Sequence, residues 1–247
     1  MKKIKVLAMF FIAVIMIACT KQAEESATEN LPEVEKTKPL VQEVLTQQQR
    51  DALSPDDILN TFIEGNKRFI NNNLTARDHS EQVRRSASGQ FPKAVVLSCL
   101  DSRVPVEDVF DRGIGDIFVG RVAGNFVNED LLGSMEFGCK VAGSKLILVM
   151  GHEHCGAIKA AIDDVKLGNI TAMLSKIQPS VDKVQYEGDR TSKNEEFVAK
   201  VCESNVIHTI EGIRAKSPIL KEMEENGDIK IVGAVYDMDS GVVNFLK

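Results

Sequence analysis

Two short segments of the chain contain residue types that could bind a metal ion. Residues 98–103 include Cys99, and residues 151–156 include His152 and Cys155. Two thiolates and one imidazole suit Zn²⁺, which accepts sulfur and nitrogen ligands. Three protein ligands leave a fourth position for water, which is the pattern of catalytic rather than structural zinc sites. We therefore predict a zinc site built from Cys99, His152 and Cys155.

Two charged residues beside Cys99 favour a catalytic role for this site. Asp101 and Arg103 follow Cys99 at intervals of two and four residues. A carboxylate and a guanidinium this close in the chain can form a bidentate ion pair. A purely structural zinc site needs neither group. The alternative interpretation of the pair is a salt bridge that only stabilises its loop.

An uninterrupted apolar run precedes each of the two segments, at residues 94–97 and 146–150. Continuous apolar runs are typical of strands buried on both faces of a parallel sheet. Open α/β sheets place their sites at the carboxyl ends of the strands. Two neighbouring strands would therefore bring the three metal ligands to one edge of the sheet.

The remaining pattern alternates strands and helices. We predict further strands at residues 116–121, 229–236 and 242–246. The predicted helices are at 55–70, 77–87, 130–141, 155–167, 170–187, 193–214 and after Pro218, and Pro179 breaks the helix at 170–187. Ser54-Pro55-Asp56-Asp57 is a helix start, with a Ser cap, an early Pro and acids near the positive end of the helix dipole. The predicted fold class is α/β, a mainly parallel central sheet flanked by helices.

The N-terminus has the pattern of an export signal. Three lysines within the first five residues precede an uncharged apolar run at 6–18, which is shorter than the roughly 20 residues of a membrane-spanning helix. Residues 16–19, Met-Ile-Ala-Cys, resemble a bacterial lipoprotein box. The resemblance implies lipidation of Cys19 and attachment to the cell envelope, on the periplasmic side. Thr20 favours the outer membrane if the cell is Gram-negative. Ordinary secretion with cleavage nearby is the alternative.

These patterns divide the chain into three parts. Residues 1–18 are the predicted signal peptide, and residues 19–50 are a predicted flexible, lipid-anchored tether because polar and charged residues dominate them. Leu40, Val41, Val44 and Leu45 have helical spacing, so part of the tether could dock as a helix. Residues 51–247 are the predicted catalytic domain.

Charge and the remaining cysteines and histidines limit the function further. The net charge is −6 over 247 residues, which gives no electrostatic basis for binding nucleic acid. Five cysteines in a chain of this length do not form a disulfide framework. We predict Cys139 and Cys202 to be buried small hydrophobic residues. We predict that His79 is a surface histidine, that His154 is not a zinc ligand, and that His208 is a surface or core residue rather than a proton shuttle.

The two metal-binding segments together resemble the β-class carbonic anhydrases. The resemblance rests on Cys99-Leu100-Asp101-Ser102-Arg103 and on residues 151–157, Gly-His-Glu-His-Cys-Gly-Ala. It extends through residues 115–125, 136–138 and 231–237 and covers the predicted domain. Gly120 and Val122 are small departures from the family pattern beside Arg121.

The resemblance implies reversible hydration of CO₂ to bicarbonate and a proton by hydroxide held on one zinc ion per subunit. Cys99, His152 and Cys155 match the zinc ligands. Asp101 and Arg103 match the catalytic pair, and in a closed state Asp101 leaves Arg103 to become a fourth ligand. Phe118 and Val122 are candidate linings of the CO₂ pocket, and Gly124 is a candidate backbone donor beside it. A homodimer or higher homo-oligomer, with the site near the subunit interface, is also implied.

Two alternative functions remain open at this point. Hydrolysis of COS or CS₂ would use the same hydroxide, and nothing in the metal motif separates these substrates from CO₂. The other alternative is a non-catalytic zinc-binding or thiol redox module, in which Cys99 and Cys155 of an exported protein could oxidise to a disulfide and lose the metal.

Overall fold

Five buried or half-buried strands form the centre of the protein, which we describe from a computed structural model. The structure describes residues 40–247, so the predicted signal peptide, Cys19 and most of the predicted tether lie outside the described residues. The strands are β1 (Ala94–Ser98), β2 (Ile117–Arg121), β3 (Leu146–His152), β4 (Lys230–Tyr236) and β5 (Val243–Phe245). Their order is β2-β1-β3-β4-β5, with β5 alone antiparallel. The predicted α/β class and mainly parallel sheet are confirmed.

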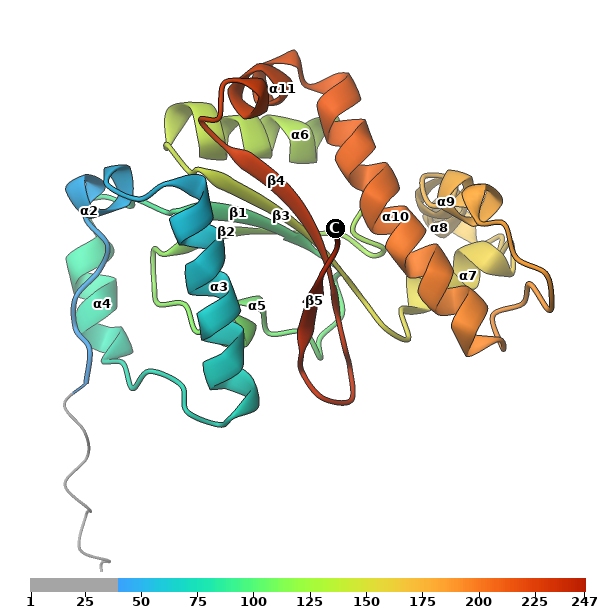
Figure 1. Cartoon of the computed structure of the whole chain (residues 1–247), viewed down its shortest axis with the longest axis horizontal. Coiled ribbons are helices and arrows are strands. Elements are labelled where there is room, and N and C mark those ends of the chain that lie inside the picture. The colour runs from blue at the N-terminus through green and yellow to red at the C-terminus, as the bar shows by residue number, and fades with distance from the viewer. Residues whose placement is uncertain (1–39) are drawn as a thin grey trace, which may run out of the picture. The chain divides into compact units, whose positions relative to one another are not determined.

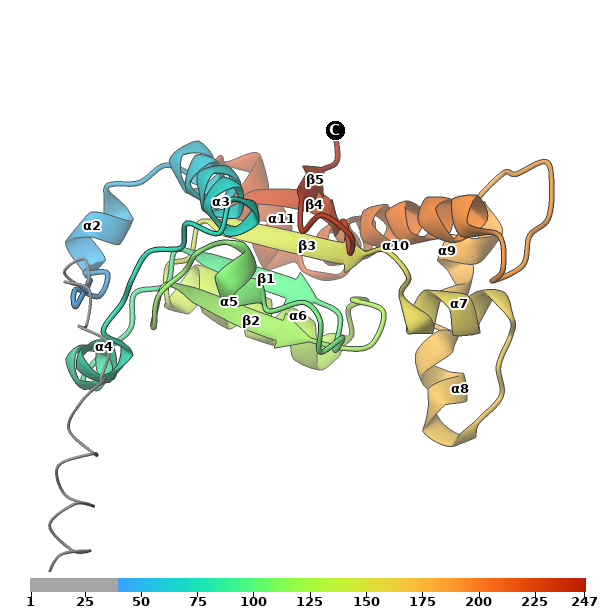
Figure 2. The same ribbon diagram turned by 90° about the horizontal axis from the view of Figure 1, so that it is seen from below.

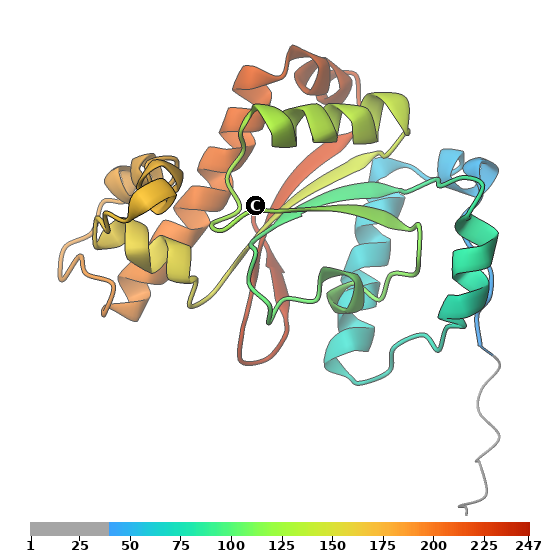
Figure 3. The same cartoon turned by 180° about the vertical axis from the view of Figure 1, so that it is seen from behind.

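Helices cover both faces of this sheet (Figures 1 and 3). On one face, α3 (Pro55–Ile70) and α5 (Val106–Val109) pack against Val96 and Leu148 through residues such as Phe62. On the other face, α6 (Glu129–Glu136), the π-helix η1 (Phe137–Val141), α10 (Glu195–Lys216) and α11 (Pro218–Glu225) pack against Leu97 and Val149. Successive strand residues thus face opposite helical layers, which explains why β1 and β3 are apolar throughout.

The carboxyl ends of the strands face a separate group of short helices (Figure 2). These are α7 (Gly156–Ile162), α8 (Gly168–Leu174) and α9 (Gln178–Lys183), and they enclose a third apolar cluster that includes Cys99 and Cys155. The helix predicted over 155–167 ends early, at Ile162, because Asp164 adopts a left-handed φ of 50°. Pro179 lies in the first turn of α9, where its missing N–H costs nothing.

The first described residues form no helix at 40–45. Val41 makes a single bridge to Arg77 instead, and Thr46 caps helix α2 (Gln47–Asp51). Arg50 of α2 is buried and donates a hydrogen bond to the carbonyl of Ala142. The folded unit described by the structure therefore begins at Leu40. Helix α4 (His79–Ser86) follows α3, as predicted.

Within residues 40–247, every helix is too short or too polar to traverse a bilayer.

Candidate active site

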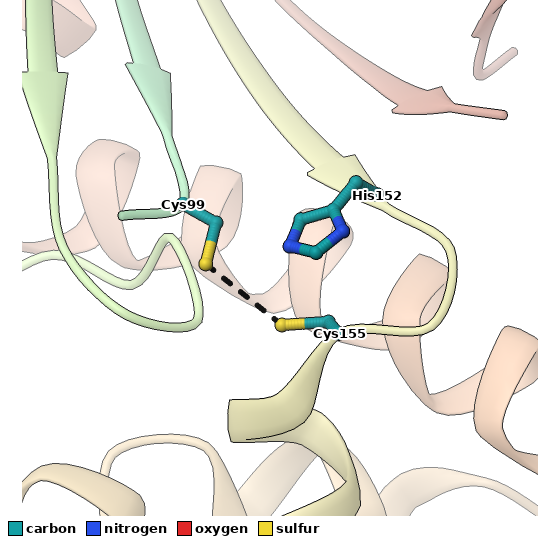
Figure 4. A group of neighbouring side chains, drawn as sticks. All are labelled: Cys99, His152 and Cys155. Carbon is teal, nitrogen blue, oxygen red and sulfur yellow. Dashed lines mark hydrogen bonds between the residues drawn. The ribbon is translucent and has the colours of Figure 1, made fainter. Parts of the chain in front are cut away.

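Cys99, His152 and Cys155 converge at the carboxyl edge of the sheet. Cys99 follows β1 directly, His152 is the last residue of β3, and Cys155 is the residue that precedes α7. The parallel pairing of Ser98 with Met150 brings the two strand ends to the same level. One ligand atom from each of the three residues lies within 4.8 Å of the others, and the two sulfurs are 3.9 Å apart (Figure 4). All three side chains are buried.

The imidazole of His152 is oriented toward this group. Its Nδ1 lies 2.8 Å from the carbonyl oxygen of Glu153, so it is the protonated nitrogen. Its Nε2 is buried and has no hydrogen-bond partner among the described residues. A backbone carbonyl on Nδ1 and a free Nε2 are the usual arrangement of a metal-binding histidine. Two sulfurs and this nitrogen are a donor set that fits Zn²⁺.

The two sulfurs differ in their surroundings. The hydrogen bond with Cys155 lowers the pKa of the Cys99 thiol, and the pKa of Cys155 is raised because Cys155 keeps the shared proton. The backbone N–H of Gly124 also donates to the Cys99 sulfur, at 3.4 Å. Gly124 has a φ of +85°, and an added Cβ would lie 2.3 Å from Cδ1 of Ile177. Only glycine can therefore place this N–H donor against the sulfur without strain.

Asp101 and Arg103 form the predicted ion pair beside the metal-binding group. The Arg103 side chain donates from Nε to one carboxylate oxygen at 2.9 Å and from a terminal nitrogen to the other at 2.7 Å. These hydrogen bonds hold the pKa of Asp101 well below its usual range. Oδ2 of Asp101 lies 3.8 Å from Nε2 of His152. An ionised carboxylate is therefore fixed next to the unpaired histidine nitrogen.

Comparison with known proteins decides the family. A family model described as carbonic anhydrase matches residues 94–243, which include every residue of the site. The chain belongs to the carbonic anhydrase family. Carbonic anhydrase 2 of Mycobacterium tuberculosis is 35% identical over 184 residues, which cover 72% of this chain and 86% of that protein. A carbonic anhydrase of Mycolicibacterium smegmatis is 34% identical over 188 residues, covering 73% and 87%.

Solved structures place the chain in the β class of the carbonic anhydrase family. A Coccomyxa β-carbonic anhydrase, solved in complex with acetazolamide, has a TM-score of 0.59 and 29% identity and covers 66% of this chain and 75% of its own. A β-carbonic anhydrase of Aspergillus fumigatus has a TM-score of 0.59 and 26% identity, with coverage of 69% and 82%.

Residues distant in sequence support this carbonic anhydrase site through contacts that the sequence did not predict. Arg121, at the end of β2, donates to the carbonyls of Cys99 at 3.0 Å and Val104 at 2.7 Å, so it joins both ends of the loop that carries Asp101 and Arg103. Asn205 of α10 is buried and donates to the carbonyl of Gly124 at 2.8 Å. In the sequence, Asn205 could have been recognised as a polar residue on the apolar face of a helix, because a buried polar side chain needs a hydrogen-bond partner.

The predicted pocket residues lie in two different places. Val122 and Gly124 are near the metal ligands, since the Val122 N–H donates to Ser98 and the Gly124 N–H donates to Cys99. Phe118 pairs in register with Val95, three residues before Ser98, and its ring lies 6.4 Å from that of Phe137. The structure therefore does not bring Phe118 to the ligands of its own subunit.

The other cysteines and histidines of the carbonic anhydrase domain lie outside the metal-binding group. Cys139 and Cys202 are buried, and burial raises the pKa of each to about 12, as expected for inert thiols. The Cys202 thiol also donates to the carbonyl of His152 at 3.3 Å. His79 is the first residue of α4 and lies on the surface. His208 of α10 faces Lys183 of α9 and Glu211 of α10.

Proposed function

We propose that the protein catalyses the reversible hydration of CO₂ to bicarbonate and a proton, with Zn²⁺ held by Cys99, His152 and Cys155. The observation that carries this proposal is the convergence of two sulfurs and an unpartnered imidazole nitrogen within 4.8 Å, with an ionised carboxylate 3.8 Å from that nitrogen. Membership of the carbonic anhydrase family supports the same reaction.

The metal and Asp101 divide the chemistry between them. A zinc ion held by Cys99, His152 and Cys155 would lower the pKa of water toward about 7 and would so supply hydroxide near neutral pH. The Asp101 carboxylate accepts a hydrogen bond from the attacking water or hydroxide and turns an oxygen lone pair toward the carbon of CO₂. CO₂ is uncharged, so apolar side chains such as Val122 suffice to bind it.

Arg103 keeps Asp101 ready for this role. Its two side-chain hydrogen bonds hold the carboxylate ionised and fix its direction. In the structure Asp101 is paired with Arg103. The closed arrangement, with Asp101 as a fourth metal ligand, requires this pair to break.

Metal dependence tests the proposed activity. Residues 40–247 are expected to bind zinc at Cys99, His152 and Cys155 and to hydrate CO₂ in a stopped-flow assay with a pH indicator. Cys155→Ser is expected to lose both the zinc and the activity, whereas Cys139→Ser keeps both. A zinc-loaded wild type that hydrolyses COS but does not hydrate CO₂ would instead support the related hydrolase function. Absence of zinc and of both activities would refute the proposal.

We further infer that the protein is a homo-oligomer. Strand β2 is at the edge of the sheet, and an apolar groove of about 580 Å³ lies beside it, lined by Phe118, Leu131 and Phe137 among others. Phe137 is 52% exposed. An open strand edge beside exposed aromatic rings favours pairing with a second copy of the chain. A related fold from Sordaria macrospora, 22% identical with a TM-score of 0.58, is described as tetrameric.

Export and lipid attachment complete the proposal. The basic start, the apolar run at 6–18 and Cys19 support a lipoprotein anchored in the bacterial envelope, with a tether that starts at Cys19. Metabolic labelling with palmitate in a bacterial host tests this. The full chain should be labelled and recovered with membranes, and Cys19→Ala should abolish the label. Label retained by Cys19→Ala, or its absence from the wild type, would refute lipidation at Cys19.

A further inference from the structure

Glu153 and His154 lie between the proposed zinc ligands His152 and Cys155 in the sequence. Their side chains belong to a second cluster of potential metal ligands. One carboxylate oxygen of Glu153, one ring nitrogen of His154 and one carboxylate oxygen of Asp239 all lie within 4.8 Å of one another. Asp239 comes from the turn that joins β4 to β5, 85 residues after His154 in the sequence. The chain therefore gathers three potential metal ligands a second time, next to the first group.

This second group surrounds a hollow that solvent can reach. The three residues line a cavity of about 190 Å³ together with Lys159, Glu195 and Cys202. Glu153 and His154 are half-buried and Asp239 is exposed. Within residues 40–247, no lysine, arginine or histidine nitrogen lies within 4.0 Å of a carboxylate oxygen of Glu153 or Asp239. The carboxylates thus face the hollow without an ion-pair partner, although Lys159 lines it.

The donor set defines the class of ion. One imidazole nitrogen and two carboxylate oxygens suit Zn²⁺ and other first-row divalent cations, and water can fill the remaining positions. An acidic cluster alone would favour Ca²⁺ or no ion, and the histidine shifts the preference to the transition metals. We propose that Glu153, His154 and Asp239 bind a second divalent transition-metal ion beside the catalytic site.

Such an ion would act on the first site through the backbone. The carbonyl of Glu153 is the partner of His152 Nδ1 at 2.8 Å, and the N–H of Glu153 donates to the carbonyl of Tyr236 at 3.0 Å. A cation held by the Glu153 side chain fixes this peptide and ties the end of β3 to the β4–β5 turn. The second site therefore stabilises the orientation of a zinc ligand, and it does not depend on which reaction the first site catalyses.

Equilibrium dialysis of the purified full chain against Zn²⁺ tests the proposal. After the first equivalent is bound, the wild type should bind a second. His154→Ala and Asp239→Asn should each weaken the second equivalent by about tenfold or more, since loss of even an outer partner of a metal costs about 10–100-fold in affinity. His208→Ala is the matched control, because His208 also faces a carboxylate, Glu211, at 3.8 Å. It should bind like the wild type.

The outcomes separate this site from the catalytic one. Retention of the first equivalent by every variant shows that the fold and the Cys99 site are intact. A wild type that binds one equivalent only, or a His154→Ala variant that binds the second like the wild type, overturns the proposal. If the wild type binds no zinc at Cys99, His152 and Cys155, the proposed zinc enzyme is contradicted. The second site is then still tested by whether His154→Ala weakens the zinc binding that the wild type shows.

Discussion

At the scale of single residues, Arg103 has a role that can be separated from zinc binding. It is more than half exposed and contacts the site through Asp101 alone among the described hydrogen bonds. Its removal leaves Cys99, His152 and Cys155 in place but frees the carboxylate to rotate. We therefore expect Arg103 to orient the Asp101 carboxylate and not to bind the metal.

Arg103→Ala is expected to keep zinc and to lower the rate of CO₂ hydration by about 10²-fold or more, within the roughly 10²–10⁴-fold range of a positioned acid–base group. Stopped-flow rates and zinc content are measured on the same samples. Arg84→Ala is the control, since Arg84 is exposed and pairs with Glu81 on α4. An Arg103→Ala variant that hydrates CO₂ as fast as the wild type would contradict the proposed role of Arg103 in orienting Asp101.

Residue types and their places after strands were sufficient to predict that Cys99, His152 and Cys155 converge and that Asp101 pairs with Arg103. The contacts of Arg121 and Asn205 were not predictable in the same way. Asn205 meets the carbonyl of Gly124 across 81 positions of sequence, and the pairing depends on how α10 packs against the sheet. A pattern within one segment carries no information on such a contact.

At the scale of elements, the turn after β2 holds the Gly124 N–H donor against the sulfur of Cys99, a proposed zinc ligand. Gly124→Ala is expected to cost about 1–2 kcal/mol for the left-handed backbone alone, to displace the N–H donor and to weaken zinc binding. Chemical denaturation and zinc competition measure the two effects. Gly212→Ala is the control within α10, where an added Cβ meets only Val127 at an ordinary 3.4 Å. Equal zinc affinity in Gly124→Ala and the wild type would contradict the role of this turn.

A buried ion cluster joins the loop after α5 to the segment that follows α3. Asp111 is fully buried, pairs with Arg68 and Arg77 and accepts hydrogen bonds from Thr75. Burial raises the pKa of Asp111, but the hydrogen bonds from Thr75, Arg68 and Arg77 together outweigh burial and leave the pKa well below its usual value. The cluster therefore stabilises the fold only while Asp111 is ionised.

Asp111→Asn is expected to destabilise the protein by about 3–5 kcal/mol, because it leaves the arginines without their buried partner. The folded pKa of Asp111 is depressed, so its contribution is present above the unfolded value of about 3.9 and is lost as the pH falls from there toward the folded pKa. Urea unfolding across this range measures both effects. Asp164→Asn, an exposed acid paired with Lys166, should cost less than about 1 kcal/mol. If Asp111→Asn and Asp164→Asn lower the free energy of unfolding by similar amounts, the stabilising role of the Asp111 cluster is contradicted.

The strands were predictable to within two residues because apolar residues dominate them and polar residues or turns bound them. Helix ends were less predictable. Helix α7 stops five residues before its predicted end at Leu167, and its last turn depends on Asp163 and Asp164 rather than on apolar spacing. Helices α2 and α5 have five and four residues, too few for a periodic pattern to emerge.

At the scale of the whole molecule, the groove beside β2 predicts association. Phe137→Asp replaces an exposed aromatic ring of this groove with a charge. The substitution is expected to convert an oligomer into monomers at micromolar concentration. Light scattering coupled to size-exclusion chromatography measures the mass. Ile207→Asp is the control, since Ile207 is 49% exposed on α10, away from the groove. A monomeric wild type, or an unchanged mass in Phe137→Asp, would contradict the predicted interface.

The most direct test of the central claim compares CO₂ hydration by the zinc-loaded wild type and by Asp101→Asn in one stopped-flow series. Asn keeps the size of Asp101 but cannot act as an ionised acceptor beside His152. We predict that both proteins hold a zinc ion at Cys99, His152 and Cys155, that the wild type hydrates CO₂ and that Asp101→Asn is slower by about 10²-fold or more. A wild type without CO₂ hydration, or an Asp101→Asn variant as fast as the wild type, would contradict the account.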